Sequence, residues 1–187
     1  PNPSFPLLRA ANHCGSRGTR VQKTLSAWLS FACSNHLVYA SDDVAGGETM
    51  TPSDIRARRE QIVRQHMEAE NAHDYAGAIA AFTHPRYELI ATDRVYNGLA
   101  EVQEYFRESR TAFPDQRNEL IVLHHAENAV IAEFWLLGTH EGPLMGVEPT
   151  GRSFRCRMAA FFLFEGTNLV CERVYFDSAT ILRQLTA

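Results

Sequence analysis

The segment at residues 172–185, ERVYFDSATILRQL, ends a strand-like alternation on the carboxylate of Asp177. Side chains of a strand point alternately to its two faces, so Arg173, Tyr175 and Asp177 share one face. A row of arginine, tyrosine and aspartate suits a polar-lined cavity, whereas the apolar face would meet another sheet, such as that of a second subunit. Asp177 could then carry protons for a reaction. The alternative is that Asp177 only caps the following helix, a common role for aspartate.

The preceding strand decides the surroundings of that carboxylate. In SFRCRMAAFFLF, Arg155 and Arg157 lie on one face, and Cys156 lies among apolar residues on the other. With an even number of loop residues, Asp177 would lie on the Cys156 face, and desolvation would raise its pKa towards the value that a base needs near neutrality. A bulge that shifts the register by one residue would instead make Asp177 an ion-pair partner of an arginine, with a low pKa. The sequence leaves both registers open.

A second group of ionisable residues lies in HMEAENAH, where His66, Glu70 and His73 form one stripe of a helix. Such a stripe could supply zinc ligands. The sequence shows no second cluster of ligands elsewhere, so we expect no metal site. His66 is instead expected to border a pocket, and Glu70 and His73 to form a solvated face.

These residues must be positioned by the elements around them, which the hydrophobic periodicity predicts from Met50 onwards. The pattern indicates a helix capped by Thr51, a short helix after Asp74, a short strand at 86–91, and a turn at 92–98. A third helix over 99–113 follows, then strands at 117–125, 129–140, 152–164 and 169–177, and a terminal helix. Successive long strands favour antiparallel pairing. The order predicts an α+β fold with three helices on the concave face of a curved sheet, leaving a pocket between the layers.

The composition excludes several classes of protein. Of the 187 residues, 45% are hydrophobic and 21% are charged, which is typical of a soluble globular protein. The formal net charge of −4 gives no basic face for nucleic acid, and no apolar run is long enough to cross a membrane. Cys156 and Cys171 fall too far apart in hairpin register for a disulfide, which suits a reducing, cytoplasmic location.

Residues 1–49 differ from the rest. They are rich in proline, glycine and arginine at first and then moderately apolar, ending in Val38-Tyr39-Ala40. We expect the native domain to start at Met50 and to extend to residue 187, with 1–49 as a non-native or upstream extension. The alternative is a secretory or targeting segment, since basic residues, an apolar stretch and small residues follow one another in this order.

Four segments resemble one family: YNGLAEVQEYF (96–106), AFPD (112–115), GTHEGPLMGVEPTGR (138–152) and LVCERVYFDSATILRQL (169–185). They are similar to the SnoaL-like polyketide cyclases and ester cyclases of the nuclear transport factor 2-like superfamily. The resemblance implies a cone-shaped α+β barrel, often dimeric, whose pocket takes a small hydrophobic or polycyclic carbonyl ligand. It further implies cyclisation or isomerisation by acid–base chemistry without metal or organic cofactor.

The resemblance also implies roles for particular residues. An aspartate at the place of Asp177 is the general acid/base of the family's intramolecular aldol closure, with His140 as a nearby polar group and Tyr175 binding a substrate oxygen. The expected substrate-binding set is Tyr175, Arg173, Arg157, Trp135 and His66. Family members usually carry tryptophan in place of Arg173, which puts the mechanism in question.

Two alternatives remain open from the sequence. The first is a non-catalytic ligand-binding or dimerisation module of the same fold, with a homodimer formed through the outer face of the sheet. The second is an epoxide or ester hydrolase, for which Asp93 and Arg94 after the first strand are the motivating residues. Neither alternative involves nucleic acid or a membrane.

Overall fold

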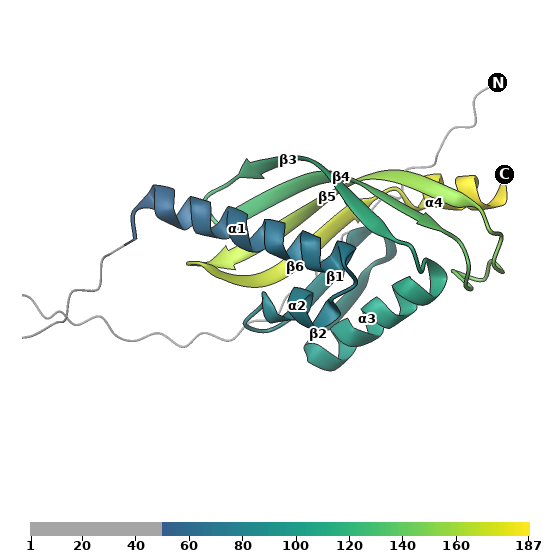
Figure 1. Ribbon diagram of the computed structural model, residues 1–187, viewed down its shortest axis with the longest axis horizontal. Coiled ribbons are helices and arrows are strands. Elements are labelled where there is room, and N and C mark those ends of the chain that lie inside the picture. The colour runs from purple at the N-terminus through teal and green to yellow at the C-terminus, as the bar shows by residue number, and fades with distance from the viewer. Residues whose placement is uncertain (1–49) are drawn as a thin grey trace, which may run out of the picture. The chain divides into compact units, whose positions relative to one another are not determined.

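The computed structural model describes residues 50–187, and the expected extension at 1–49 lies outside the described residues. Four α-helices accompany a curved, open sheet of six strands in the order β2-β1-β6-β5-β4-β3 (Figure 1). The α+β fold predicted from the sequence is therefore confirmed. The helices are α1 (Pro52–Asn71), α2 (Tyr75–Ala80), α3 (Leu99–Ala112) and α4 (Ser178–Thr186). The strands are β1 (Arg86–Leu89), β2 (Arg94–Asn97), β3 (Arg117–His125), β4 (Ala129–Thr139), β5 (Ser153–Glu165) and β6 (Asn168–Phe176).

The starts of the first two helices follow from local hydrogen bonding. Thr51 and Asp54 form a capping box, in which each side chain accepts a hydrogen bond from the backbone N–H of the other. Pro52 occupies the first helical position, where its missing N–H costs nothing. The carboxylate of Asp74 accepts from Gly77 N–H and caps α2. The predicted cap at Thr51 and the predicted helix after Asp74 are thus confirmed.

The strands from β3 to β6 pair antiparallel in chain order, as predicted, but β1 differs from the expected picture. It pairs antiparallel with β2 and parallel with β6, so that Glu88 lies opposite Arg173. The residues of β2 were expected to form a turn. A short 3₁₀ turn that ends at Asp93, with φ of 52°, instead reverses the chain and lets Arg94–Asn97 add an edge strand.

The core lies between the helices and the concave face of the sheet. Every second residue of β5 from Phe154 to Phe164 is buried, whereas Arg155 and Arg157 on the opposite face are exposed. Figure 1 shows α1 running across this face of the sheet, with α2 and α3 following it. The buried residues of α1, which include Val63, His66 and Met67, point into the same core. Among residues 50–187, no helix has the length and apolar character needed to span a membrane.

The orientation of β6 is the reverse of the one favoured by the sequence. Val174 is only 5% exposed on the inward face, whereas Tyr175 is 42% exposed on the outward face. Burial of the apolar Val170, Val174 and Phe176 side of the strand gains more free energy than burial of its arginine and tyrosine side. The polar row therefore faces out of the cone, and the expectation that it lines the cavity is wrong.

Candidate functional site

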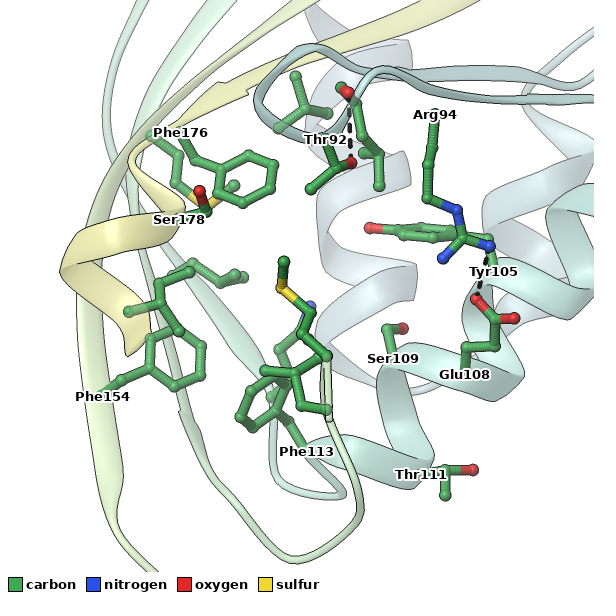
Figure 2. Close-up of a pocket in the computed structure, with 18 of the residues that line it drawn as sticks. Thr92, Arg94, Tyr105, Glu108, Ser109, Thr111, Phe113, Phe154, Phe176 and Ser178 are labelled. Atoms are coloured by element: carbon green, nitrogen blue, oxygen red, sulfur yellow. Dashed lines mark hydrogen bonds and ion pairs between the residues drawn. The ribbon is translucent and has the colours of Figure 1, made fainter. Parts of the chain in front are cut away.

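A cavity of about 680 Å³ opens between α3, the inward faces of β5 and β6, and α4. Its walls are mainly apolar and include the side chains of Phe113, Phe154, Met158, Val174, Phe176 and Ile181. Figure 2 shows Phe154 and Phe176 on the wall opposite α3, and Phe113 near the end of that helix. This volume and lining match those of sites for small, largely apolar molecules.

Among the polar side chains of the described lining, three are unpaired: Tyr105 from α3, Gln116 before β3, and Ser178 at the start of α4. Gln116 is 8% exposed overall. None of the three side chains makes a hydrogen bond to another group within residues 50–187. Their hydroxyl and carboxamide groups are therefore free to bind oxygen atoms of a ligand.

Behind the cavity lies a buried network of ionisable side chains. Nδ1 of His66 donates to the carbonyl oxygen of Ala78 at 3.0 Å. Nε2 of His66 lies 3.2 Å from Oε2 of Glu172 and 3.5 Å from Oε1 of Glu70. The Tyr87 hydroxyl is 3.3 Å from the same nitrogen. Both ring nitrogens thus face acceptors, an arrangement that favours the imidazolium form.

Burial and mutual contact set the pKa values in this network. Burial alone would lower the pKa of His66, but the charge of Glu70 and the hydrogen bond that His66 donates to Glu172 raise it to about 10. Burial raises the pKa of Glu172, and the charge of Glu70 adds to this rise. The pKa of Glu70 is lowered despite burial, because His66 lies beside it and Asn118 Nδ2 donates to its Oε2 at 2.8 Å.

Tyr105 connects the cavity to the network. Its ring lines the cavity, and its centroid is 5.3 Å from that of Tyr87. Burial raises the pKa of Tyr105, and the charges of Glu70 and Glu172 raise it further. Tyr105 therefore remains a protonated hydrogen-bond donor at neutral pH.

The network also contains the group of residues within 50–187 that could hold a metal ion. Ligand atoms of His66, Glu70 and Glu172 all lie within 4.8 Å of one another. His73, the third member of the sequence stripe, is not part of this group, because its Nε2 lies 3.2 Å from the backbone oxygen of Gln116. The two glutamates contact the imidazole directly, so the same arrangement is also that of a buried ion pair.

Asp177 adopts the geometry of a helix cap. It is the N-cap of α4, and its carboxylate accepts from Thr180 N–H at 3.1 Å and lies 3.7 Å from Nη2 of Arg183. Its side chain is 59% exposed, and the hydrogen bond from the Thr180 hydroxyl is the main cause of its lowered pKa. The carboxylate is thus an exposed, ionised group, although its neighbours Phe176 and Ser178 both line the cavity.

A register shift explains this outcome. The hairpin between β5 and β6 contains an irregularity at Leu163 and Phe164, and Met158 lies opposite Phe176. This is the bulged register that the sequence left open, although the arginine beside Asp177 is Arg183 of α4 rather than Arg155 or Arg157. The catalytic role expected for Asp177 stays a prediction.

Four of the expected binding residues lie on the outer face of the sheet. Arg173 pairs with Glu88, and Tyr175 packs against Phe161 with ring centroids 5.4 Å apart. Arg157 pairs with Glu133 at 2.6 Å and lies over the ring of Trp135. The structure brings Trp135 and Arg157 together, but neither they nor Arg173 and Tyr175 belong to the cavity lining.

The two expected histidines are both buried, in different places. His66 is 1% exposed and belongs to the network behind the cavity. His140 has no solvent exposure, and its Nδ1 accepts from Thr150 N–H at 3.3 Å. Its ring lies 5.7 Å from that of Phe113, so it sits behind one wall of the cavity rather than in its lining.

Sequence reasoning missed Glu172, Tyr105 and Gln116 as candidate site residues. Glu172 had a signal, because it falls among Val170, Val174 and Phe176 on the apolar face of its strand. A carboxylate in an apolar row of a strand predicts a buried, paired acid. Tyr105 and Gln116 had no comparable signal, because their exposure depends on how α3 and its following loop meet the sheet.

Comparisons with known proteins agree with this architecture. A candidate SnoaL-like polyketide cyclase from Jannaschia sp. CCS1 is 16% identical, with a TM-score of 0.65, and the match covers 75% of this chain and 99% of that one. IdmH of Streptomyces antibioticus, a candidate polyketide cyclase, is 20% identical over 69% of this chain and 99% of its own, with a TM-score of 0.60.

A third solved structure, from Catenulispora acidiphila, has a ketosteroid isomerase-like fold and was determined in complex with trimethylamine. It is 15% identical, covers 67% of this chain and 92% of its own, and has a TM-score of 0.59. These three likenesses establish the shared fold. No curated protein matches the sequence.

The family comparison covers nearly the whole described part of the chain. Residues 60–185 match the model of the SnoaL-like polyketide cyclases. The match includes α3, the strands β5 and β6 that line the cavity, the buried network, and α4 up to residue 185. The chain therefore belongs to the SnoaL-like polyketide cyclase family, a membership that supports a cyclase-type function acting on small molecules.

Proposed function

We propose that this protein binds a small, largely apolar carbonyl compound in the cavity and promotes its cyclisation or isomerisation by proton transfer. The observation that supports the proposal is the apolar cavity, one wall of which presents the protonated Tyr105. A hydrogen bond from Tyr105 to the carbonyl oxygen stabilises the negative charge that develops there when a proton leaves the adjacent carbon. Burial of Tyr105, together with the charges of Glu70 and Glu172, raises its pKa and keeps it protonated.

The proton acceptor in this proposal is Asp177, by resemblance to the family. Its lowered pKa keeps it ionised, as a base must be, but also makes it a weak base. Asp177 takes the proton from the carbon beside the carbonyl, and the resulting enolate attacks a second carbonyl group to close a ring. The same proton is returned to the new alkoxide, so the step balances without a further reactant. Its carboxylate must first leave its position at the start of α4.

Proton exchange in deuterium oxide tests this reaction class without knowledge of the natural substrate. β-Tetralone carries acidic hydrogens beside its carbonyl and has the size of a two-ring ligand. We expect the protein to accelerate loss of these hydrogens, followed by proton NMR, over buffer alone. Tyr105→Phe removes one donor to the developing oxyanion and should slow the protein-dependent exchange by roughly 10²-fold.

Two tryptophan variants on α4 separate the cavity from the rest of the molecule. Leu182 lines the cavity, and Leu182→Trp should fill it and abolish binding and exchange. Ala179 is exposed on the same helix and outside the lining, so Ala179→Trp serves as the matched control. Exchange that survives Leu182→Trp, in a variant that remains folded, would rule out the cavity as the site.

The second candidate function is non-catalytic binding in the same cavity. It is favoured by the exposed position of Asp177 and its contact with Arg183. Both functions predict that the protein binds β-tetralone, but only the catalytic one predicts that Asp177→Asn loses exchange. Binding without any accelerated exchange in the unmodified protein would establish the non-catalytic alternative.

A further inference from the structure

The mouth of the cavity carries an ion pair that is unlike the rest of its lining. Nη2 of Arg94, on β2, lies 3.1 Å from Oε2 of Glu108 on α3 (Figure 2). The Tyr96 hydroxyl donates to the same carboxylate oxygen at 3.2 Å. The Arg94 guanidinium also lies over the Tyr96 ring, 4.8 Å from its centroid. Glu108 thus contacts both Arg94 and Tyr96, and its negative charge neutralises that of Arg94.

The second arginine of the lining is neutralised in the same way. Arg107 of α3 pairs with Glu104, one turn earlier on that helix. Lysine and histidine do not occur among the lining residues within the described part of the chain. An incoming carboxylate would therefore lose hydration without meeting a free cation. Desolvation of a neutral carbonyl group costs less free energy, and its oxygen can still accept a hydrogen bond from Tyr105 or Gln116.

We propose that Glu108 is a specificity residue, which makes the cavity select neutral carbonyl compounds over carboxylates of the same shape. The inference rests on the proposed function, because it takes the cavity as the ligand site. Without Glu108, Arg94 would be a free cation at the mouth and would attract a carboxylate. Glu108 thereby biases the protein towards ketones or esters and against the corresponding free acids.

Two probes with the same ring system test the selection of neutral carbonyl compounds over carboxylates. A naphthyl methyl ketone and the corresponding naphthoate differ mainly in charge, and their binding can be followed by fluorescence at pH 7.5. We expect the unmodified protein to bind the ketone at least about tenfold more tightly than the acid. Failure of the ketone to bind would overturn the proposed function itself. Binding of both probes with equal affinity would overturn only the selection.

The Glu108→Gln variant tests the residue. The glutamine can still accept from Tyr96, but it no longer neutralises Arg94. We expect naphthoate affinity to rise about three- to tenfold at low salt, with the gain lost at high salt, and ketone affinity to stay within about twofold. The double variant Arg94→Gln, Glu108→Gln should lose the gain.

Glu119→Gln provides the control for net charge. Glu119 lies on the outer sheet face, where it pairs with Arg155, so its loss changes the total charge equally but leaves the mouth intact. It should not change the affinity for either probe. An equal rise of naphthoate affinity in Glu119→Gln and Glu108→Gln would show a general charge effect and would overturn the role assigned to Glu108.

Discussion

Glu172 and His66 lie 106 positions apart in the chain, and their Oε2 and Nε2 atoms are 3.2 Å apart in the core. His66 is 1% exposed and Glu172 is 5% exposed. Because each is a charged or polar group withdrawn from water, the stability of the fold depends on their protonation states.

The raised pKa of His66 predicts a loss of stability at alkaline pH. The folded protein holds the proton up to a pKa of about 10, whereas the unfolded chain releases it near 6.5. The stabilisation is therefore complete below pH 6.5 and is lost as the pH rises towards 10. We expect the free energy of unfolding, measured by urea titration, to fall by about 2 kcal/mol or more between pH 7 and 10.

Two histidine variants identify the source of this pH dependence. His66→Gln should be less stable at pH 7 and should show a flatter dependence between pH 7 and 10. His124→Gln replaces an exposed strand histidine and should keep the dependence of the unmodified protein. An unchanged slope in His66→Gln would contradict the assignment.

Removal of the buried Glu172 carboxylate should lower the free energy of unfolding more than removal of the surface Glu133 carboxylate. Glu172→Gln leaves the imidazolium with one carboxylate partner, and we expect it to lower the free energy of unfolding by about 3 kcal/mol. Glu133→Gln breaks the pair with Arg157 on the outer face and should cost about 0.5 kcal/mol or less. Chemical denaturation at pH 7 compares the two, and equal losses would argue against a buried ion pair.

Substitutions of Asp177 can separate capping from catalysis. Asparagine caps helices about as well as aspartate, so Asp177→Asn should change stability by less than about 0.5 kcal/mol. Asp177→Ala loses the acceptor for Thr180 N–H and should cost about 1 kcal/mol. Thermal or urea unfolding measures both effects. A large destabilisation by asparagine would mean that the ionised carboxylate itself is needed for the fold.

Gly142 allows the loop after β4 to approach α3 closely. A Cβ atom at this position would lie 2.1 Å from the backbone oxygen of Thr111, so alanine requires the loop to move. The following residues Pro143, Leu144 and Met145 line the cavity. We expect Gly142→Ala to cost about 1–3 kcal/mol and to weaken β-tetralone binding. Glu141→Ala, at the exposed neighbouring position, should alter neither property.

Much of the fold could be predicted from the sequence because local patterns determine it. Thr51, Asp74 and the alternating residues of β5 each carry their signal within a few positions. The β2 strand was missed because it has four residues and depends on the αL conformation of Asp93. The chain reverses between β1 and β2, and the residues of β2 have a composition that is typical of a turn, so the sequence did not predict this strand.

The candidate site was harder to predict because its parts depend on relative placement. A one-residue irregularity in the hairpin decides the surroundings of Asp177, and the sequence could not fix it. The alternation of β6 correctly separated two faces, but the choice of the inward face requires knowledge of what packs against it. The pairing of Glu172 with His66 was therefore not predicted.

The parallel pairing of β6 with β1 has a consequence for biosynthesis. Tyr87 lies opposite Glu172 in this pairing. Residues of β1 are therefore synthesised well before β6, the strand with which they pair. During translation, His66, Glu70 and Tyr87 emerge before their partner strand exists. The nascent chain must therefore keep these groups hydrated until β6 leaves the ribosome, and closure of the sheet around them should be a late, slow event that a holding chaperone would assist.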